Sequence, residues 1–320
     1  MRVLITGVAG FIGSSIARAE LQRGNDVLSI DCFIDYYPRA IKENNLKPLL
    51  SDPHFRFQEA SLLDANLDAL LDGVAVIYHQ AAQAGVRASW GRDFQIYTQN
   101  NVQATQRLLE ACKGRDLRLV YASSSSVYGN TEHLPMNEEH PTVPISPYGV
   151  TKLAAEYLAR LYWTNFGVPT VSLRYFTVYG PGQRPDMAFH KLIKAMLRGE
   201  EFAVFGDGDQ TRDFTFISDA VAANLAAAER GRSGGVYNIG GGSRVTLKEV
   251  IALLEKIVAK PARIRNVEPQ KGDVRHTYAD TSRAREDFGY SPRVKLEDGL
   301  AAEVEWIRAV ILPFENSRIP

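Results

Sequence analysis

The N-terminal segment constrains the fold more than any other part of this 320-residue chain. A short apolar run over residues 2–6 is typical of a buried strand, and residues 14–21 are typical of a helix. Between them lie three evenly spaced glycines, Gly7, Gly10 and Gly13. In a strand–turn–helix unit such glycines allow a tight turn, a close approach of backbone to a pyrophosphate, and packing of helix on strand. The segment therefore predicts a dinucleotide-binding unit, with the free N–H groups of the helix facing phosphate.

A second predicted strand, over residues 26–30, ends in Asp31. A carboxylate at this position can accept a hydrogen bond from a ribose 2′-hydroxyl and repels a 2′-phosphate. The predicted cofactor is therefore NAD rather than NADP. The alternative is a structural βαβ turn that binds no ligand.

Composition excludes several classes of protein. The chain has 37 basic and 37 acidic residues, so its charge indicates neither a nucleic-acid footprint nor a surface for acidic membranes. Its two cysteines, Cys32 and Cys112, have no companions at metal-ligand spacing and are expected to be reduced thiols. Glycines interrupt the N-terminal apolar run, and no apolar stretch reaches the roughly 18 residues of a spanning helix. We expect a cytoplasmic protein that holds no metal and binds neither nucleic acid nor membrane.

Strand and helix patterns alternate as far as about residue 175. Strands are predicted at residues 74–79, 117–122 and 170–175, and helices at 101–111 and 148–166. This alternation predicts an α/β fold with a doubly wound parallel sheet, which binds ligands at the carboxyl ends of its strands.

The chain is expected to form two domains, each assembled from separate stretches. Residues 1–176 and 210–240 form the predicted NAD-binding Rossmann domain. Residues 177–209 and 241–320, where the alternation loosens, form a smaller mixed α/β domain for the substrate.

A tyrosine and a lysine four residues apart, Tyr148 and Lys152, lie on one face of a predicted helix. A tyrosine acts as a base near neutral pH when a neighbouring positive charge favours its ionised form. Ser124 belongs to a run of serines at the end of the preceding strand, where a hydroxyl can orient or shuttle the proton. By itself the Tyr/Lys spacing is more often a solvated helix face.

Three motifs together resemble the extended short-chain dehydrogenase/reductase superfamily. They lie at residues 6–13, 123–129 and 146–152, and the resemblance to its NAD-dependent nucleotide-sugar epimerases and dehydratases spans essentially the whole chain. It implies that Ser124, Tyr148 and Lys152 form the catalytic triad. It also implies the following NAD-binding residues: Gly7, Gly10, Phe11, Ile12, Gly13, Asp31, Ser61, Leu62, Gln80, Ala81, Ala82, Asn101, Tyr148 and Lys152. His79, next to this set, is interpreted as a packed, hydrogen-bonded histidine rather than a catalytic one.

The serine segment also bears on the reaction. The dehydratases and decarboxylases of this family carry a carboxylate just before the Val-Tyr-Gly motif, where this chain has Ser125 and Ser126. Without that acid, the resemblance implies 4-epimerisation: C4 of the sugar is oxidised to a 4-keto intermediate, the sugar rotates, and hydride returns to the opposite face.

Two further segments resemble UDP-glucuronate 4-epimerases, which convert UDP-glucuronate to UDP-galacturonate. They are residues 83–87 and 174–188, and the second has Thr177 where neutral UDP-hexose epimerases usually have Asn. A uronate carboxylate suits hydroxyl donors and a bidentate guanidinium such as that of Arg184. The alternative is that Arg184 is a loop arginine paired with Asp186.

The nucleotide end is expected around residues 204–219 and 272–275, with Arg212 and Arg275 meeting the diphosphate. The resemblance implies these substrate-binding residues: Gly85, Val86, Arg87, Ser125, Ser126, Thr177, Arg184, Ala188, Val204, Phe205, Arg212 and Arg275.

The helices over residues 95–112 and 148–166 carry more apolar residues than one sheet face needs. The resemblance implies a homodimer in which these helices form a four-helix bundle. The residues expected on this face are Leu108, Leu109, Leu153, Tyr157, Leu158 and Leu161.

Three other functions remain open at this point. They are a UDP-glucose/UDP-galactose 4-epimerase, a UDP-glucuronate decarboxylase, and a catalytically inactive dinucleotide-sensing regulator. Thr177 and Arg184 argue against the first, Ser126 against the second, and the intact Ser/Tyr/Lys set against the third.

Overall fold

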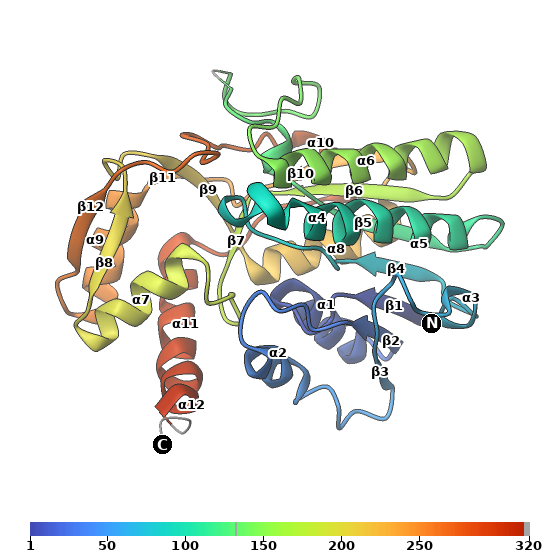
Figure 1. The fold of residues 1–320 in the computed structure, drawn as a ribbon, viewed down its shortest axis with the longest axis horizontal. Helices are drawn as coiled ribbons and strands as arrows, with labels where there is room; N and C mark the ends of the chain where they lie inside the picture. Colours follow the sequence, from blue (N-terminus) through green and yellow to red (C-terminus); the bar gives the residue numbers. More distant parts are fainter. Residues whose placement is uncertain (132, 317–320) are drawn as a thin grey trace.

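A computed structural model describes residues 1–131 and 133–316 of the chain (Figure 1). Within them, seven parallel strands form one sheet in the order β10-β6-β5-β4-β1-β2-β3. The predicted doubly wound α/β fold is confirmed. The strands are β1 (Arg2–Thr6), β2 (Asp26–Asp31), β3 (Phe55–Glu59), β4 (Val76–His79), β5 (Arg118–Ser124), β6 (Thr170–Tyr175) and β10 (Gly235–Ile239).

Helices pack on both faces of this sheet and bury two apolar layers against it. One face carries α1 (Phe11–Gln22), α2 (Arg39–Leu46), α8 (Ile217–Arg230) and α10 (Ser282–Phe288). The other carries α3 (Leu67–Leu70), α5 (Ala104–Cys112) and α6 (Pro147–Phe166). Because its strands are covered on both sides, the sheet exposes ligand-binding groups mainly at its edges and strand ends.

Local sequence signals fix the ends of α6, the helix that carries Tyr148 and Lys152. Its N-cap, Ser146, accepts a hydrogen bond from the Gly149 N–H at 3.1 Å, and proline stands at the first helical position. The helix ends at Gly167, whose φ of 69° is left-handed. Tyr148 therefore lies in the first turn, beside the carboxyl end of β5.

A smaller lobe lies to the left of the main sheet in Figure 1. It contains a three-stranded sheet and a two-stranded sheet around a separate apolar core. Its strands are β7 (Thr177–Tyr179), β8 (Glu201–Phe205), β9 (Thr211–Phe216), β11 (Arg244–Thr246) and β12 (Arg263–Val267). Its helices are α7 (Ala188–Arg198), α9 (Leu247–Val258), α11 (Leu296–Trp306) and α12 (Leu312–Asn316).

The strand β9 departs from the expected division of the chain. Residues 210–240 were expected in the main domain, but β9 pairs with β7 and β11 in the smaller lobe. Of that stretch, only β10 pairs in the main sheet, and α8 packs on one face of it. The sequence Thr-Arg-Asp-Phe-Thr-Phe of β9 does not by itself specify which sheet the strand will complete.

A short helix, α4 (Phe94–Tyr97), continues through a π-helical turn at Thr98–Gln103 into α5. A second π-helical turn, Ile307–Ile311, follows α11. Single 3-10 turns occupy Arg87–Ser89, Gly91–Asp93 and Ser125–Val127.

Among residues 1–131 and 133–316, none of the helices has the length and apolar character needed to cross a membrane. The same part of the chain contains no group of three His, Cys, Asp or Glu residues arranged to hold a metal ion. Cys32 and Cys112 are free thiols.

His79 is buried, and its two ring nitrogens lie 2.7 Å from Thr6 Oγ1 and 2.9 Å from Thr105 Oγ1. Burial lowers the pKa of His79 to about 3, so the ring is neutral. The prediction of a packed, hydrogen-bonded histidine is confirmed.

Candidate active site

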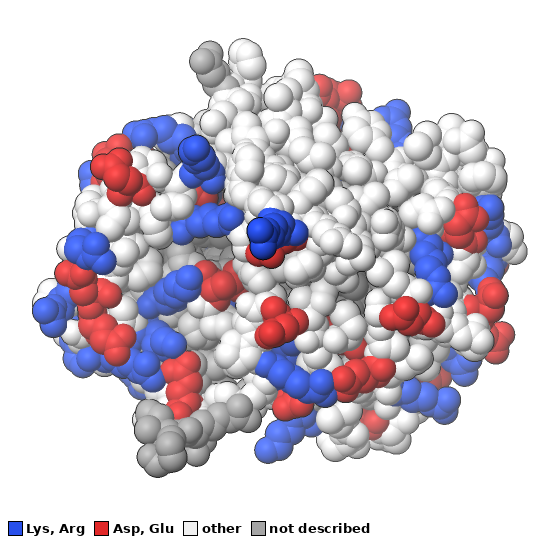
Figure 2. All heavy atoms as spheres, in the orientation of Figure 1, with Lys and Arg blue, Asp and Glu red and all other residues white. Residues whose placement is uncertain are grey.

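A cavity of about 1060 Å³ lies between the carboxyl ends of the main-sheet strands and the smaller lobe. Figure 2 shows this face of the molecule hollowed between the two parts, with basic side chains along the hollow. Residues from both parts line the cavity, so it can hold a ligand that spans them.

The glycine turn after β1 forms the floor of one end of the cavity. A Cβ added at Gly7 would lie 2.7 Å from the Ala81 backbone, and one at Gly13 would lie 2.3 Å from the Gly7 carbonyl oxygen. Gly7 also has a φ of +70°. Helix α1 begins at Phe11, and its N-cap, Gly10, has no side chain to cap it, so its first N–H groups are available to an anion. This cradle fits the pyrophosphate of a dinucleotide.

Asp31 lies at the end of β2 and lines the same part of the cavity. Its two carboxylate oxygens accept hydrogen bonds from the Ala9 N–H at 3.0 Å and the Phe33 N–H at 2.8 Å. Burial raises the pKa of Asp31, while these two N–H donors oppose the rise. Each oxygen keeps a lone pair for a ribose hydroxyl, so the fit to NAD is retained.

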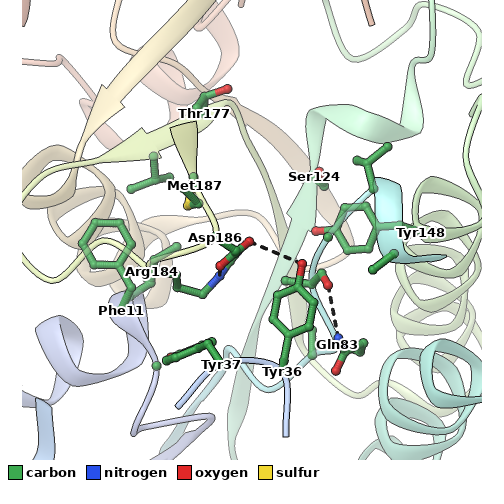
Figure 3. Close-up of a pocket in the computed structure, with 18 of the residues that line it drawn as sticks. Phe11, Tyr36, Tyr37, Gln83, Ser124, Tyr148, Thr177, Arg184, Asp186 and Met187 are labelled. Carbon is green, nitrogen blue, oxygen red and sulfur yellow. Dashed lines mark hydrogen bonds and ion pairs between the residues drawn. The ribbon is translucent and has the colours of Figure 1, made fainter. Parts of the chain in front are cut away.

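Tyr148, Ser124 and Lys152 all line this cavity. The Tyr148 hydroxyl points toward Ser124 (Figure 3), whose own hydroxyl oxygen accepts a hydrogen bond from the Ser126 N–H at 3.1 Å. Burial raises the pKa of Tyr148, and the neighbouring Ser124 hydroxyl and the charge of Arg184 act in the opposite direction. Lys152 is 2 % exposed, and burial lowers its pKa to about 7 although Glu156 opposes the change. The pKa of Lys152 therefore lies near neutral pH, whereas the free protein keeps Tyr148 protonated.

A buried ion pair supports this centre from behind. Arg174 of β6 and Glu156 of α6 lie 2.6 Å apart with both side chains 6 % exposed. Ser123, next to Ser124, donates its hydroxyl to the same carboxylate at 2.6 Å. The ends of β5 and β6 are thereby fixed against the helix that carries Lys152.

Asn101 supports the site without lining the cavity. It lies in the π-helical turn before α5, and its amide nitrogen donates to the Gln83 carbonyl and to Thr151 Oγ1, both at 3.0 Å. Its amide oxygen accepts from the Gln83 N–H at 2.7 Å. Asn101 thus fixes the segment after β4 to α6, rather than presenting its amide to a cofactor.

The sugar end of the cavity contains an ion pair. Arg184 donates through Nε and Nη2 to the two oxygens of Asp186, at 2.9 and 3.0 Å. Thr177, Ser125 and Ser126 line the wall nearby. The sequence offered two interpretations of Arg184, a carboxylate ligand or a partner of Asp186. In this structure the arginine is paired with Asp186 and lines the cavity at the same time.

The nucleotide end carries three arginines in different surroundings. Arg87 pairs with Asp273 at 2.6 Å, and its guanidinium lies 4.0 Å from the centre of the Phe205 ring. Arg275 pairs with Asp207 at 2.9 Å and does not line the cavity.

Arg212 is the third arginine of this end. It donates to the carbonyl oxygens of Thr211 and Arg275 at 2.9 and 3.0 Å, and it forms no ion pair with any described residue. Burial lowers its pKa. A half-buried guanidinium with spare N–H donors is the group that a diphosphate would satisfy.

The structure brings most of the expected site residues to one cavity. Those that line it are Gly7, Gly10, Phe11, Ile12, Gly13, Asp31, Ser61, Leu62, Gln80, Ala81, Ala82, Gly85, Val86, Arg87, Ser124, Ser125, Ser126, Tyr148, Lys152, Thr177, Arg184, Ala188, Val204, Phe205 and Arg212. Asn101 and Arg275 lie outside the lining.

Sequence reasoning missed Tyr36, Tyr37 and Lys42, which also line the cavity. They belong to the segment after β2 and to α2. The paired tyrosines soon after Asp31 were the available signal, but no motif used in the sequence analysis included them.

Comparison with known proteins places the chain in a family. Residues 3–240 match the model of the "NAD dependent epimerase/dehydratase family". "Uncharacterized UDP-glucose epimerase YtcB" of Bacillus subtilis (strain 168) is 44% identical over 97% of this chain and 99% of its own.

Two solved proteins have the same fold. UDP-glucuronic acid 4-epimerase from Bacillus cereus, in complex with UDP-glucuronic acid and NAD, has a TM-score of 0.94 and 46% identity, covering 96% of this chain and 99% of its own. MoeE5, in complex with UDP-glucuronic acid and NAD, has a TM-score of 0.87 and 41% identity, covering 96% and 99%. MoeE5 has also been solved with UDP-glucose and NAD. This chain belongs to the NAD dependent epimerase/dehydratase family.

Proposed function

We propose that this protein is an NAD-dependent UDP-sugar 4-epimerase that interconverts UDP-glucuronate and UDP-galacturonate. The observation that carries the proposal is that Ser124, Tyr148 and Lys152 line one cavity, with the Tyr148 hydroxyl pointing toward Ser124 (Figure 3). The same cavity contains a dinucleotide cradle and a second region rich in hydroxyl and guanidinium groups. The similarity to an epimerase bound to UDP-glucuronic acid and NAD supports the substrate class.

NAD would lie along the carboxyl ends of β1, β2 and β4. The turn at Gly7, Gly10 and Gly13 would hold its pyrophosphate, and Asp31 its adenosine ribose. When bound, NAD supplies the reversible oxidation of the sugar C4 alcohol.

Tyr148 is the proposed general base. Its phenol oxygen would take the proton of the sugar C4 hydroxyl. After the sugar has rotated to present its opposite face, Tyr148 would return a proton to the C4 oxygen. Ser124 would hold the C4 oxygen through its hydroxyl, toward which the Tyr148 hydroxyl points. Lys152, when protonated, would favour the ionised form of Tyr148 through its positive charge.

The uronate carboxylate would be held by Thr177, Ser125, Ser126 and Arg184. Oxidation at C4 makes glucuronate a β-keto acid, which loses CO2 when its carboxylate bond aligns with the carbonyl π system. Donors on both sides of the carboxylate can keep it out of that alignment. The absence of a carboxylate at positions 125 and 126 supports epimerisation over elimination or decarboxylation.

UDP-glucose is a second candidate substrate, because the Arg184 charge is balanced by Asp186 and a structural neighbour has been solved with UDP-glucose. The test is to incubate the protein with UDP-glucuronate, UDP-glucose and UDP-N-acetylglucosamine in parallel and to identify each product sugar by NMR. We expect UDP-galacturonate to form fastest. Epimerisation of UDP-glucose alone would overturn the uronate assignment.

The cofactor is tested independently by denaturing the purified protein and analysing the nucleotide that it releases. We expect NAD, because Asp31 opposes a 2′-phosphate and because a 4-epimerase returns its hydride to the same sugar. Release of NADP, or a requirement for stoichiometric added NAD, would contradict the cycle.

We infer a homodimer formed through α5 and α6, in the cytoplasm. Tyr157 and Leu161 of α6 are 51 % and 53 % exposed, which supports a contact on this face. Leu108 and Leu109, also expected at the interface, are instead part of the buried core, and Leu153 and Leu158 pack partly against core clusters. Light scattering at micromolar concentration should report a dimer, and a monomer would refute the inference.

A further inference from the structure

Asp186 holds the Arg184 guanidinium from a fixed position in the sugar end of the cavity. The two side chains are 24 % and 26 % exposed and are joined by two parallel hydrogen bonds. Both line the cavity, and Figure 3 shows them facing the space in front of Tyr148 and Ser124. The pairing lowers the pKa of Asp186 even though burial acts in the opposite direction, so Asp186 carries a negative charge at neutral pH.

A third residue fixes Asp186 from the dinucleotide side. The Tyr36 hydroxyl donates to Asp186 Oδ2 at 3.3 Å (Figure 3). The same hydroxyl sits against Gly85, where a Cβ would lie 2.1 Å from it and where φ is +105°. Tyr36 therefore has room only because residue 85 is a glycine. The Asp186 carboxylate is held from two directions, by Arg184 and by Tyr36.

The pair is electrically neutral, and this decides what the pocket can attract. A guanidinium has five N–H donors, and Asp186 occupies two of those on Arg184. The remaining donors can still bind a sugar hydroxyl or a carboxylate oxygen. A uronate carboxylate, however, approaches the arginine together with the negative charge of Asp186, whereas a neutral sugar meets no such repulsion.

Building on the proposed function, we propose that Asp186 is the specificity-determining residue of the sugar pocket. In the free protein its carboxylate binds two N–H donors of Arg184. Its negative charge reduces the difference between the affinity for a uronate and the affinity for a neutral hexose. The uronate then binds through the N–H donors of Arg184 that Asp186 leaves open, or by displacing Asp186 from them.

The test measures the affinity of the NAD-loaded protein for UDP-glucuronate and for UDP-glucose by calorimetric titration. Asp186→Asn keeps the size of the side chain and an oxygen that can accept from Arg184, but removes the charge. We expect UDP-glucuronate to bind about three- to tenfold more tightly to this variant, as for removal of one opposing charge from a partly exposed ion pair. The affinity for UDP-glucose should change by less than about twofold, because that sugar has no charge to be repelled.

Asp273→Asn is the matched control, because Asp273 is the partner of Arg87 at the nucleotide end. The two ligands share their nucleotide, so this variant should shift both affinities equally. A double-mutant cycle with Arg184→Ala completes the design: without the arginine the Asp186 charge is no longer neutralised, so Asp186→Asn should change the affinity ratio at least as much as it does in the wild-type background.

Three outcomes would overturn the proposal. An unchanged affinity ratio in Asp186→Asn would show that the carboxylate does not set the preference. A shift that disappears with Arg184→Ala would show that the Asp186 charge does not repel the uronate carboxylate. Failure of the wild-type protein to bind either nucleotide sugar would overturn the proposed function and, with it, this inference.

Discussion

The two ends of the cavity hold their polar groups in different ways. At the dinucleotide end, glycine geometry, a helix N-terminus and backbone N–H donors to Asp31 form a rigid cradle. At the sugar-nucleotide end, Arg87, Arg184 and Arg275 are each paired with an aspartate of the protein itself. The first end is shaped for one ligand. At the second end, an arginine must leave its aspartate, or bind the aspartate and the ligand at the same time, when a ligand binds.

This difference separates affinity from selectivity. Because a preformed cradle does not have to be reordered, binding costs little conformational free energy, which suits a cofactor that stays bound through many turnovers. Arginines that are paired with aspartates offer hydrogen-bond donors without a large net charge, so an anionic ligand gains less electrostatic free energy on binding. A single carboxylate can then set the difference in affinity between two ligands. Arg212, which forms no ion pair with any described residue, is the exception at this end and the expected anchor of the diphosphate.

The largest expected effect comes from Tyr148, which lies between the two ends of the cavity. Tyr148→Phe keeps the volume of the ring and removes only the ionisable hydroxyl. Losing a general base typically lowers the rate about 100- to 10,000-fold. NAD content and the affinity for the UDP-sugar, measured by calorimetry, should stay nearly unchanged. A variant that retains more than roughly a tenth of the rate would exclude Tyr148 as the base.

A smaller effect is expected at the sugar-nucleotide end, where the arginines are paired with aspartates. Arg184→Ala removes a charge-assisted contact of about 1.5–3 kcal/mol, which corresponds to roughly a 10- to 150-fold loss of kcat/KM on UDP-glucuronate. Any activity on UDP-glucose should fall far less, because that sugar has no carboxylate. The measurement is steady-state kinetics on both substrates.

The same variant tests whether Arg184 protects the keto acid. If the arginine holds the carboxylate out of alignment, Arg184→Ala should release CO2 and a UDP-4-keto-pentose detectable by mass spectrometry. Equal losses on both substrates without a decarboxylated product would mean that Arg184 serves only to order its loop through Asp186.

The smallest expected effect concerns a carboxyl group that has no ion partner among the described residues. Glu303 of α11 is fully buried, and one of its oxygens accepts from the Gly180 N–H at 2.8 Å. The other oxygen has no hydrogen-bond partner among the described residues. Burial raises the pKa of Glu303 to about 8, which is well above its ordinary value.

Because the folded-state pKa is raised, the folded protein binds a proton that the unfolded chain releases. The stability from this group is fully present below about pH 4.5 and is lost as the pH rises to about 8. Glu303→Gln cannot ionise, so its melting temperature relative to wild type should rise by a few °C between pH 5.5 and pH 8.5. Glu305→Gln, on the exposed face of the same helix, is the control. A difference in melting temperature that does not vary with pH would contradict the buried neutral carboxyl.

The sequence predicted the parts of the site that depend on local pattern. The glycine turn, Asp31 at the end of β2, and Ser124, Tyr148 and Lys152 could be placed because the carboxyl ends of parallel strands meet at one edge of a sheet. Helical spacing fixed which side chains of α6 share a face. These relations act over a few residues or follow from the fold class, so one chain is enough to predict them.

The tertiary structure alone decided the contacts between distant segments. Tyr36 reaches Asp186 across 150 residues of sequence, and Arg87 reaches Asp273 across 186. Apolar spacing could not tell Leu108, which is buried in the core, from Leu161, which is exposed, because both fit a helical repeat. Whether a side chain is buried, and which residues it contacts, depends on the surfaces that the folded chain brings together. These contacts are set by three-dimensional packing, and the residues next to it in the sequence do not determine them.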